Sequence, residues 1–72
     1  MSELREIDCR GLRCPLPIIR IAKELPTIEV GEELILLSDD PATKPDLAAW
    51  SRMRNQFSRE IAEGRYLIRR MN

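Results

Sequence analysis

Cys14 is the residue of this 72-residue chain with the clearest capacity for chemistry. Pro15 and Pro17 follow it, and an apolar helical pattern begins behind them. Proline fixes its own φ angle and lacks an N–H group, so it is tolerated in the first turn of a helix. Leu16 precedes a proline and should avoid the α region, so we expect regular helix only from Pro17. Cys14 should therefore lie at or just before a helix N-terminus, where free backbone donors and a partial positive charge stabilise a thiolate.

Two interpretations of Cys14 are open: a reactive surface thiol, or a small buried hydrophobe. Arg10 and Arg13 favour the reactive interpretation, because neighbouring positive charge lowers the pKa of a thiol. The chain contains no histidine, so a Cys-His hydrolase mechanism is excluded within it. The remaining chemistry needs only a nucleophilic sulfur: thiol–disulfide exchange or carriage of a persulfide.

Cys9 lies five residues before Cys14, a spacing that differs from the C-x-x-C of dithiol oxidoreductases. We interpret it as an ordinary residue at the end of a strand, and a resolving or regulatory thiol is the alternative. A disulfide between the two cysteines across the turn at Gly11 stays open, because it depends on geometry that the sequence does not give.

Asp39 and Asp40 are a second pair of residues that could do chemistry. Because Pro41 and a helical pattern follow them, they are more typical of a turn and a helix start than of acid–base catalysis or a cation site. Two cysteines without histidine cannot complete a tetrahedral zinc site, and no metal or cofactor is expected. Ser51 has no histidine to activate it and should be catalytically silent.

The overall composition excludes several classes of function. Twelve basic and twelve acidic residues cancel, which makes the chain a poor candidate for strong nucleic-acid binding. No stretch approaches the roughly 20 apolar residues of a transmembrane helix, and the N-terminal residues carry no apolar run. We expect one domain over residues 1–72, located in the cytoplasm with free thiols, with no membrane partner and little room for a deep substrate pocket.

Hydrophobic patterning predicts the elements that must position Cys14, in the order β-α-β-α-β-β. Strands are expected at 4–8, 33–38, 57–62 and 65–70, and helices at 17–25 and 45–56. The run at 33–38 is continuously apolar, which favours a central strand, and Glu63-Gly64 is a hairpin signal. The expected fold is an α/β (α+β) two-layer sandwich, with two helices on one face of a four-stranded mixed sheet.

The first predicted helix should bury one face and expose the other. Ile18, Ile21, Ala22 and Leu25 share the core-facing side at helical spacing. Leu16 falls on the polar side near the sulfur, which makes it a candidate docking residue; an incidental exposed leucine is the alternative.

The second predicted helix should bury Leu47, Trp50 and Met53 on one face. Trp50 is interpreted as a core residue, with a binding platform as the alternative. Arg69 and Arg70 end the last strand, where a solvated terminus is expected and a partner-facing patch is the alternative.

Taken together, the motif residues resemble the TusA family (also called SirA-like) of sulfur-carrier proteins. The resemblance spans nearly the whole chain and rests on Asp8, Gly11-Leu12-Arg13-Cys14-Pro15-Leu16-Pro17, Gly31-Glu32, Asp39-Asp40-Pro41-Ala42-Thr43 and Tyr66-Leu67-Ile68-Arg69-Arg70. It implies a two-layer α/β sandwich, in agreement with the pattern-based prediction.

The resemblance also implies a function: a sulfane sulfur is accepted as a persulfide on Cys14 and passed to another protein. By role, the expected site comprises the sulfur-carrying Cys14, the supporting residues Gly11, Arg13, Pro15 and Pro17, the docking candidates Arg10, Leu16 and Arg20, and the structural turn Asp39, Asp40 and Pro41. Such a protein is a persulfide carrier rather than an enzyme that turns over a free small substrate.

Partners and pathway are implied in the same way. The donor would be a cysteine desulfurase or a rhodanese-type protein, and the acceptor a sulfur-relay protein such as a DsrE-like one. The relay would end in tRNA thiolation, sulfur oxidation or molybdenum-cofactor maturation. Two departures leave the branch of the family open: Arg54-Asn55-Gln56 replaces a common Gly-His, and Ser51 stands where some members have cysteine.

Two other functions remain open from the residues alone. The first is a non-catalytic regulatory or interaction module that binds a partner through the Cys-Pro-Leu-Pro edge. The second is a thiol–disulfide redox domain that uses Cys9 and Cys14.

Overall fold

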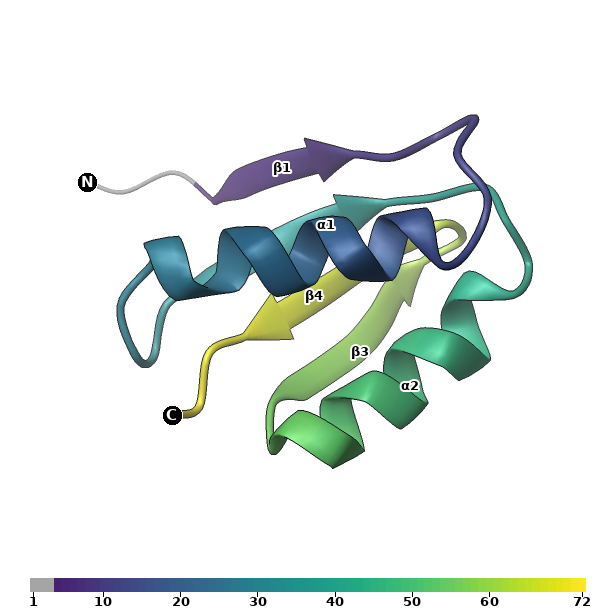
Figure 1. Cartoon of the computed structure of the whole chain (residues 1–72). Helices are drawn as coiled ribbons and strands as arrows, with labels where there is room; N and C mark the ends of the chain where they lie inside the picture. Colours follow the sequence, from purple (N-terminus) through teal and green to yellow (C-terminus); the bar gives the residue numbers. More distant parts are fainter. Residues whose placement is uncertain (1–3) are drawn as a thin grey trace.

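The computed structural model describes residues 4–72, so residues 1–3 of the expected domain lie outside the described part (Figure 1). The elements are β1 (Arg5–Asp8), α1 (Leu16–Glu24), the 3-10 helix η1 (Leu25–Thr27), β2 (Glu33–Leu37), α2 (Thr43–Arg54), β3 (Phe57–Ala62) and β4 (Arg65–Arg69). The predicted order of strands and helices is confirmed. The strand boundaries differ from those predicted by at most one residue, and those of the helices by one or two.

The four strands form one mixed sheet in the order β1-β2-β4-β3. β1 pairs with β2 in parallel, and the β2–β4 and β3–β4 pairs are antiparallel. β2 is therefore a central strand, as its continuous apolar run predicts. Because β1 and β2 are parallel, their C-terminal ends lie at the same end of the sheet. Cys14 and the two aspartates follow these strand ends.

The two helices cover one face of the sheet and enclose the core between the layers (Figure 1). Strand residues of the core alternate with outward-facing residues, as the pleat of a sheet requires. The buried apolar cluster comprises Ile7, Cys9, Ile18, Ile21, Leu25, Ile28, Leu34, Leu36, Leu47, Tyr66 and Ile68.

α1 confirms most of its predicted inner face, since Ile18, Ile21 and Leu25 are buried. Ala22 is exposed, so its assignment to the core was wrong. The helix begins at Leu16 rather than at Pro17. The proline disfavours the α region at Leu16 without forbidding it, and the Leu16 N–H closes the first turn by donating to the Arg13 carbonyl at 2.9 Å.

α2 departs more strongly from its predicted inner face. The buried positions are Thr43, Leu47 and Ser51, spaced four residues apart. Trp50 only packs against the margin of the core, and Met53 is 78 % exposed, so the prediction that Met53 is a core residue was wrong. The helix packs on the edge strand β3 through hydroxyl groups, with Ser51 Oγ donating to Ser58 Oγ at 2.7 Å. An apolar count could not reveal this face, because two of its three residues are polar.

The second face of the sheet is covered by no helix in the described chain, yet Ile35 on it is only 2 % exposed. Its neighbours across the sheet are Glu6 on β1 and Leu67 on β4. Arg65 forms an ion pair with Glu6 at 2.7 Å along the same face. Arginine stems lie flat on apolar surface while their charged heads stay in water. Paired side chains thus shield the centre of this face.

Candidate functional site

Cys14 lies on the segment that joins β1 to α1, immediately before the helix N-cap residue Pro15. The predicted position of the thiol at a helix N-terminus is therefore borne out by the fold. Pro15 is exposed and Pro17 is buried, and the Cys14–Pro15 peptide bond is cis. The thiol is partly buried against the core cluster.

The two aspartates of the β2–α2 connection hold the cysteine segment through its backbone. Asp40 Oδ2 accepts a hydrogen bond from the Cys14 N–H at 2.8 Å, and Asp39 Oδ1 accepts one from the Gly11 N–H at 3.0 Å. Gly11 has φ +85°, a left-handed conformation that favours glycine. Asp40 Oδ1 also accepts the Ala42 N–H at 2.9 Å, a side-chain contact typical of a turn residue.

The sequence analysis did not predict the hydrogen bonds between the two aspartates and the backbone of the cysteine segment. A signal for it existed in the predicted β-α-β order. A parallel crossover brings the residues after the first strand and those after the second strand to one edge of the sheet. Carboxylates after one strand then face the free N–H groups of the loop after the other. These N–H donors lower the pKa of Asp40, that of Ala42 first and that of Cys14 second.

The environment of the sulfur differs from the electropositive one that was expected. The pKa of the Cys14 thiol is raised from its ordinary value, first by burial and then by Asp46 and Asp40; the Thr43 hydroxyl acts in the opposite direction. Thr43 Oγ1 lies 3.4 Å from Cys14 Sγ. The prediction of a lowered pKa was therefore wrong for the chain by itself.

The arginines fail to produce that effect because their charges act elsewhere. Arg10 binds Asp8 through Nη2 at 2.9 Å and through Nε at 3.0 Å, and this bonding lowers the pKa of Asp8 to about 2. The exposed Arg13 acts on Asp40, where it helps to lower the pKa of the carboxyl group. Arg20, a docking candidate, pairs with Glu24 at 3.2 Å.

Three exposed apolar residues lie in and just before the start of α1. Leu16 is 49 % exposed, as predicted, and it is joined by Leu12 at 38 % and Ile19 at 45 %. Leu12 and Ile19 were not predicted as site residues. Their signal was the same as that of Leu16: apolar residues near the cysteine that fall outside the inner face of the helix.

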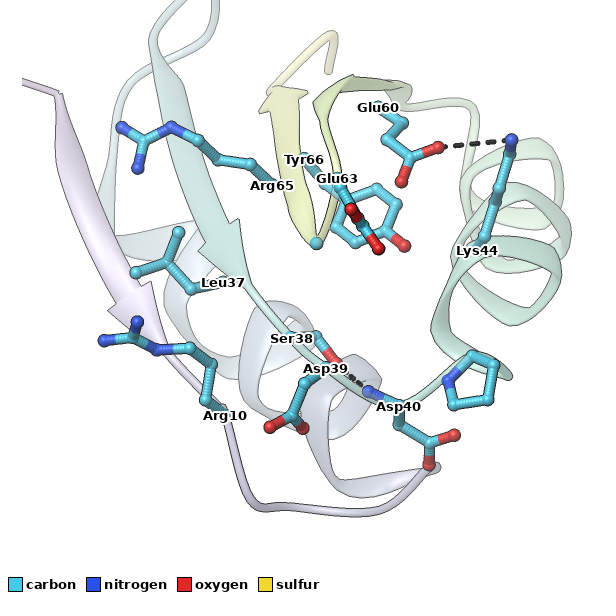
Figure 2. A pocket seen from close by; sticks show the side chains of 12 residues that line it. Arg10, Leu37, Ser38, Asp39, Asp40, Lys44, Glu60, Glu63, Arg65 and Tyr66 are labelled. Carbon is cyan, nitrogen blue, oxygen red and sulfur yellow. Dashed lines mark hydrogen bonds and ion pairs between the residues drawn. The ribbon is translucent and has the colours of Figure 1, made fainter.

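An open groove of about 720 Å³ lies beside the aspartate turn (Figure 2). Its walls come from the end of β2, the start of β4, the β3–β4 hairpin and the start of α2. Lys44 and Glu60, which both line the groove, form an ion pair at 3.1 Å. The lining residues are Arg10, Leu37, Ser38, Asp39, Asp40, Pro41, Lys44, Glu60, Glu63, Gly64, Arg65 and Tyr66. Cys14 is not among them, so the groove does not enclose the thiol.

The remaining predicted residues have structural surroundings. Cys9 is completely buried, both cysteines are free thiols, and Ser51 is engaged with Ser58. Arg69 bonds Glu33 through two nitrogens, at 2.7 and 2.9 Å, and its guanidinium lies over the Phe57 ring at 5.1 Å. Arg70 bonds the Ile28 carbonyl, which ties the chain end to the loop before β2.

Over residues 4–72, no cluster of three or more potential metal-binding side chains occurs. Within the same residues, no helix is long and apolar enough to cross a membrane. Fold and site together define a class of protein: a small two-layer α+β domain that presents one thiol at a helix start, held through its backbone by a neighbouring loop.

A comparison with protein families makes this class specific. The family model described as sulfurtransferase TusA matches residues 5–70 of the 72-residue chain. The chain belongs to the TusA family, as the motif residues indicated. Membership assigns it a general role in sulfur transfer and relay, which implies a partner that donates sulfur and a partner that accepts it.

Proposed function

We propose that the protein is a sulfur carrier that accepts a sulfane sulfur on Cys14 as a persulfide and passes it to another protein. The observation that carries the proposal is the way in which the fold holds Cys14 by its backbone, in a chain that belongs to the TusA family. The Cys14 N–H donates a hydrogen bond to Asp40 at 2.8 Å, and Cys14 as a residue is only partly buried. Transfer between two protein cysteines needs a sulfur that a partner can reach and a backbone that holds it in place.

The transfer step needs no other reactant. The deprotonated Sγ of Cys14 attacks the terminal sulfur of a persulfide on the donor. The new Sγ–S bond forms as the S–S bond of the donor breaks, and the donor leaves as a thiolate that takes up a proton. One sulfur atom moves, one thiol is consumed and one is released, so no external oxidant or reductant is required. The reverse attack by an acceptor thiol discharges the carrier.

Partners and pathway form the finer part of this proposal. The donor is a cysteine desulfurase or a rhodanese-type protein, and the acceptor is a sulfur-relay protein of DsrE-like type. Leu12, Leu16 and Ile19 are exposed apolar residues within five positions of Cys14, and they support docking of a partner near this segment, because exposed apolar residues that gather on a surface mark interaction sites. We place the protein in the cytoplasm, where free thiols persist.

The test is mass spectrometry of the intact protein after incubation with a cysteine desulfurase and cysteine, or with rhodanese and thiosulfate. The wild type should gain the mass of one sulfur atom, and Cys14→Ser should abolish that gain. Cys9→Ser is the matched control and should be loaded like the wild type, because Cys9 is completely buried. A wild type that stays unmodified by active donors would contradict the proposal, as would loading that survives in Cys14→Ser.

One observation favours a second candidate, the non-catalytic interaction module. The raised pKa of Cys14 and its packing against the core suit a thiol that only fills space. This candidate predicts that Cys14→Ala retains partner binding and cellular function. Loss of function in Cys14→Ala, with thermal unfolding unchanged, would exclude it.

A further inference from the structure

Two buried hydroxyl groups connect the sulfur of Cys14 to the backbone of the aspartate turn. Thr43 is fully buried and Ser38 is 2 % exposed. Ser38 Oγ lies 2.7 Å from Thr43 Oγ1, which in turn lies 3.4 Å from Cys14 Sγ. This series of hydrogen bonds begins at the Asp40 N–H, which donates to Ser38 Oγ at 3.4 Å (Figure 2).

The direction of these hydrogen bonds follows from what each group can donate. A backbone N–H can only donate, so Ser38 Oγ is an acceptor toward Asp40. The single hydroxyl proton of Ser38 is then free to point at Thr43 Oγ1, and the proton of Thr43 is free to point at the sulfur. A thiolate has no proton and accepts only. When Cys14 is deprotonated, each of the two hydroxyl groups therefore accepts from the group before it and donates to the group after it.

We propose that Ser38 and Thr43 form a one-directional hydrogen-bond relay that supplies a donor to the deprotonated sulfur of Cys14. Thr43 contacts the reacting atom and acts as a catalytic residue, and Ser38 is a positioning residue that acts through Thr43. The inference rests on the proposed function, since it names the groups that sustain the nucleophile of that site.

The relay acts on the pKa of Cys14 in the opposite direction to the carboxylates near the sulfur. Asp46 on α2 and Asp40 before it place negative charge near Cys14, and Tyr66 on β4 is a neighbour whose own pKa is raised by burial, Glu60 and Cys14. Arg13 carries positive charge on the same segment, but it acts on Asp40. The hydroxyl of Thr43 is thus the group whose hydrogen bond favours the anion at the sulfur.

The position of Ser38 is itself fixed by the fold. Its N–H donates to the Gly64 carbonyl at 3.0 Å in the β3–β4 turn. Gly64 has φ +71°, and a Cβ atom there would lie 2.8 Å from the Ser38 carbonyl oxygen. The hairpin therefore approaches Ser38 as closely as a residue without a side chain allows, which holds the base of the relay in place.

The experiment measures the rate of alkylation of Cys14 by iodoacetamide against pH, with the label localised to Cys14 by peptide mass spectrometry. Thr43→Val keeps the shape of the side chain and removes the hydroxyl. We expect its pH midpoint to move upward and its rate at neutral pH to fall about five- to tenfold, the scale of one hydrogen bond that contributes about 1 kcal/mol. Ser38→Ala should move the midpoint in the same direction by less, and Thr43→Ser should stay close to the wild type.

Ser51→Ala is the matched control. It removes a buried hydroxyl from the same face of α2 and breaks its bond to Ser58, but it lies two helical turns away from Thr43. It should lower thermal stability without moving the pH midpoint. An unchanged midpoint in Thr43→Val would overturn the relay. If that variant fails to fold, an unchanged midpoint in Ser38→Ala together with a shifted one in Thr43→Ser would overturn it equally.

Sulfur loading of the same variants separates this inference from the proposed function. A shifted alkylation profile in a protein that no donor loads would leave the relay intact and remove the carrier function. Normal loading rates in Thr43→Val, with an unchanged profile, would remove the relay and leave the carrier function intact.

Discussion

At the scale of single residues, the surroundings of Cys14 favour the protonated form of its thiol. Burial and the carboxylates Asp46 and Asp40 raise the pKa of Cys14, and only the Thr43 hydroxyl acts against them. Because oxidation of cysteine follows its thiolate character, this environment lowers the susceptibility of the Cys14 thiol to oxidation. Reactivity is therefore restrained by the residues that also hold the cysteine in position.

The Asp40 carboxylate makes a first prediction at this scale. Asp40→Ala removes the acceptor of both the Cys14 and the Ala42 N–H groups. The Cys14 amide should then exchange its proton with solvent faster by roughly an order of magnitude, as expected for loss of a charge-assisted hydrogen bond. Hydrogen exchange followed by NMR measures this.

Asp40→Asn is the control for that measurement. Its side chain retains one carbonyl oxygen, so it can serve one of the two N–H groups and should give an intermediate exchange rate. Equal protection of the Cys14 amide in the wild type and in Asp40→Ala would show that the carboxylate does not hold the loop.

At the scale of elements, the structure is a βαβ crossover completed by a hairpin, and the two halves meet at Ser38. The parallel pair β1–β2 brings Cys14 and Asp40 to one edge. The hairpin between β3 and β4 then closes on Ser38 from the other side. Neither half by itself contains all of the groups that contact the sulfur and its relay.

The inner face of α2 gives a prediction at this scale. Leu47 is 2 % exposed and Met53 is 78 % exposed. Leu47→Ala should lower the free energy of unfolding by about 2–5 kcal/mol, because it leaves a cavity in the core. Met53→Ala should change it by no more than about 0.5 kcal/mol. Urea denaturation of the two variants side by side checks this, and similar losses in both would contradict the assigned face.

The same helix shows how far sequence patterning reaches. The strands and α1 were predictable because their buried residues are apolar and keep the spacing of a strand or a helix. The inward line of α2 runs through Thr43 and Ser51, whose hydroxyl groups are satisfied by Ser38 and Ser58. Such partners come from other elements, so a pattern of apolar residues assigned Met53 to the core instead.

The site divides in the same way. Cys14, its place at a helix start and the exposure of Leu16 follow from local rules about proline and helical spacing. The pKa of the thiol does not, because it depends on Asp46 and Thr43, which reach it only through the tertiary fold. The arginine effect was overestimated because Asp8 neutralises Arg10 locally.

At the scale of the whole molecule, paired charges cover much of a surface with no net charge. Arg65–Glu6 and Arg69–Glu33 lie on the second face of the sheet, and Arg10–Asp8 lies beside it. Exposed ion pairs contribute little each, about 0–1 kcal/mol, and salt screens them. Their collective effect should be visible in the dependence of stability on pH.

The acid side of that dependence is a prediction. Asp8 and Asp40 have folded-state pKa values below the ordinary value of 3.8, about 2 for Asp8. A lowered pKa gives stability that is complete above the unfolded-state pKa and is lost as pH falls toward the folded-state pKa. The Tm should therefore drop between about pH 5 and pH 2.

Asp8→Asn isolates one contribution to this drop. The variant should lose less Tm on acidification than the wild type, and the difference should shrink in high salt, because the Asp8–Arg10 pair is exposed. Thermal unfolding by circular dichroism over a pH series measures both curves. Curves that run parallel would show that the Asp8 carboxylate contributes no pH-dependent stability.

The contacts that hold Cys14 can form only after the later part of the chain has been synthesised. Asp40 and Thr43 follow Cys14 by 26 and 29 residues in the chain. At synthesis rates of about 5–20 residues per second, the ribosome produces the thiol one to several seconds before the groups that hold it. A nascent chain thus carries Cys14 before the residues that contact it, Asp40 and Thr43, have been added. The finished fold, rather than the motif alone, therefore sets the surroundings of the Cys14 thiol.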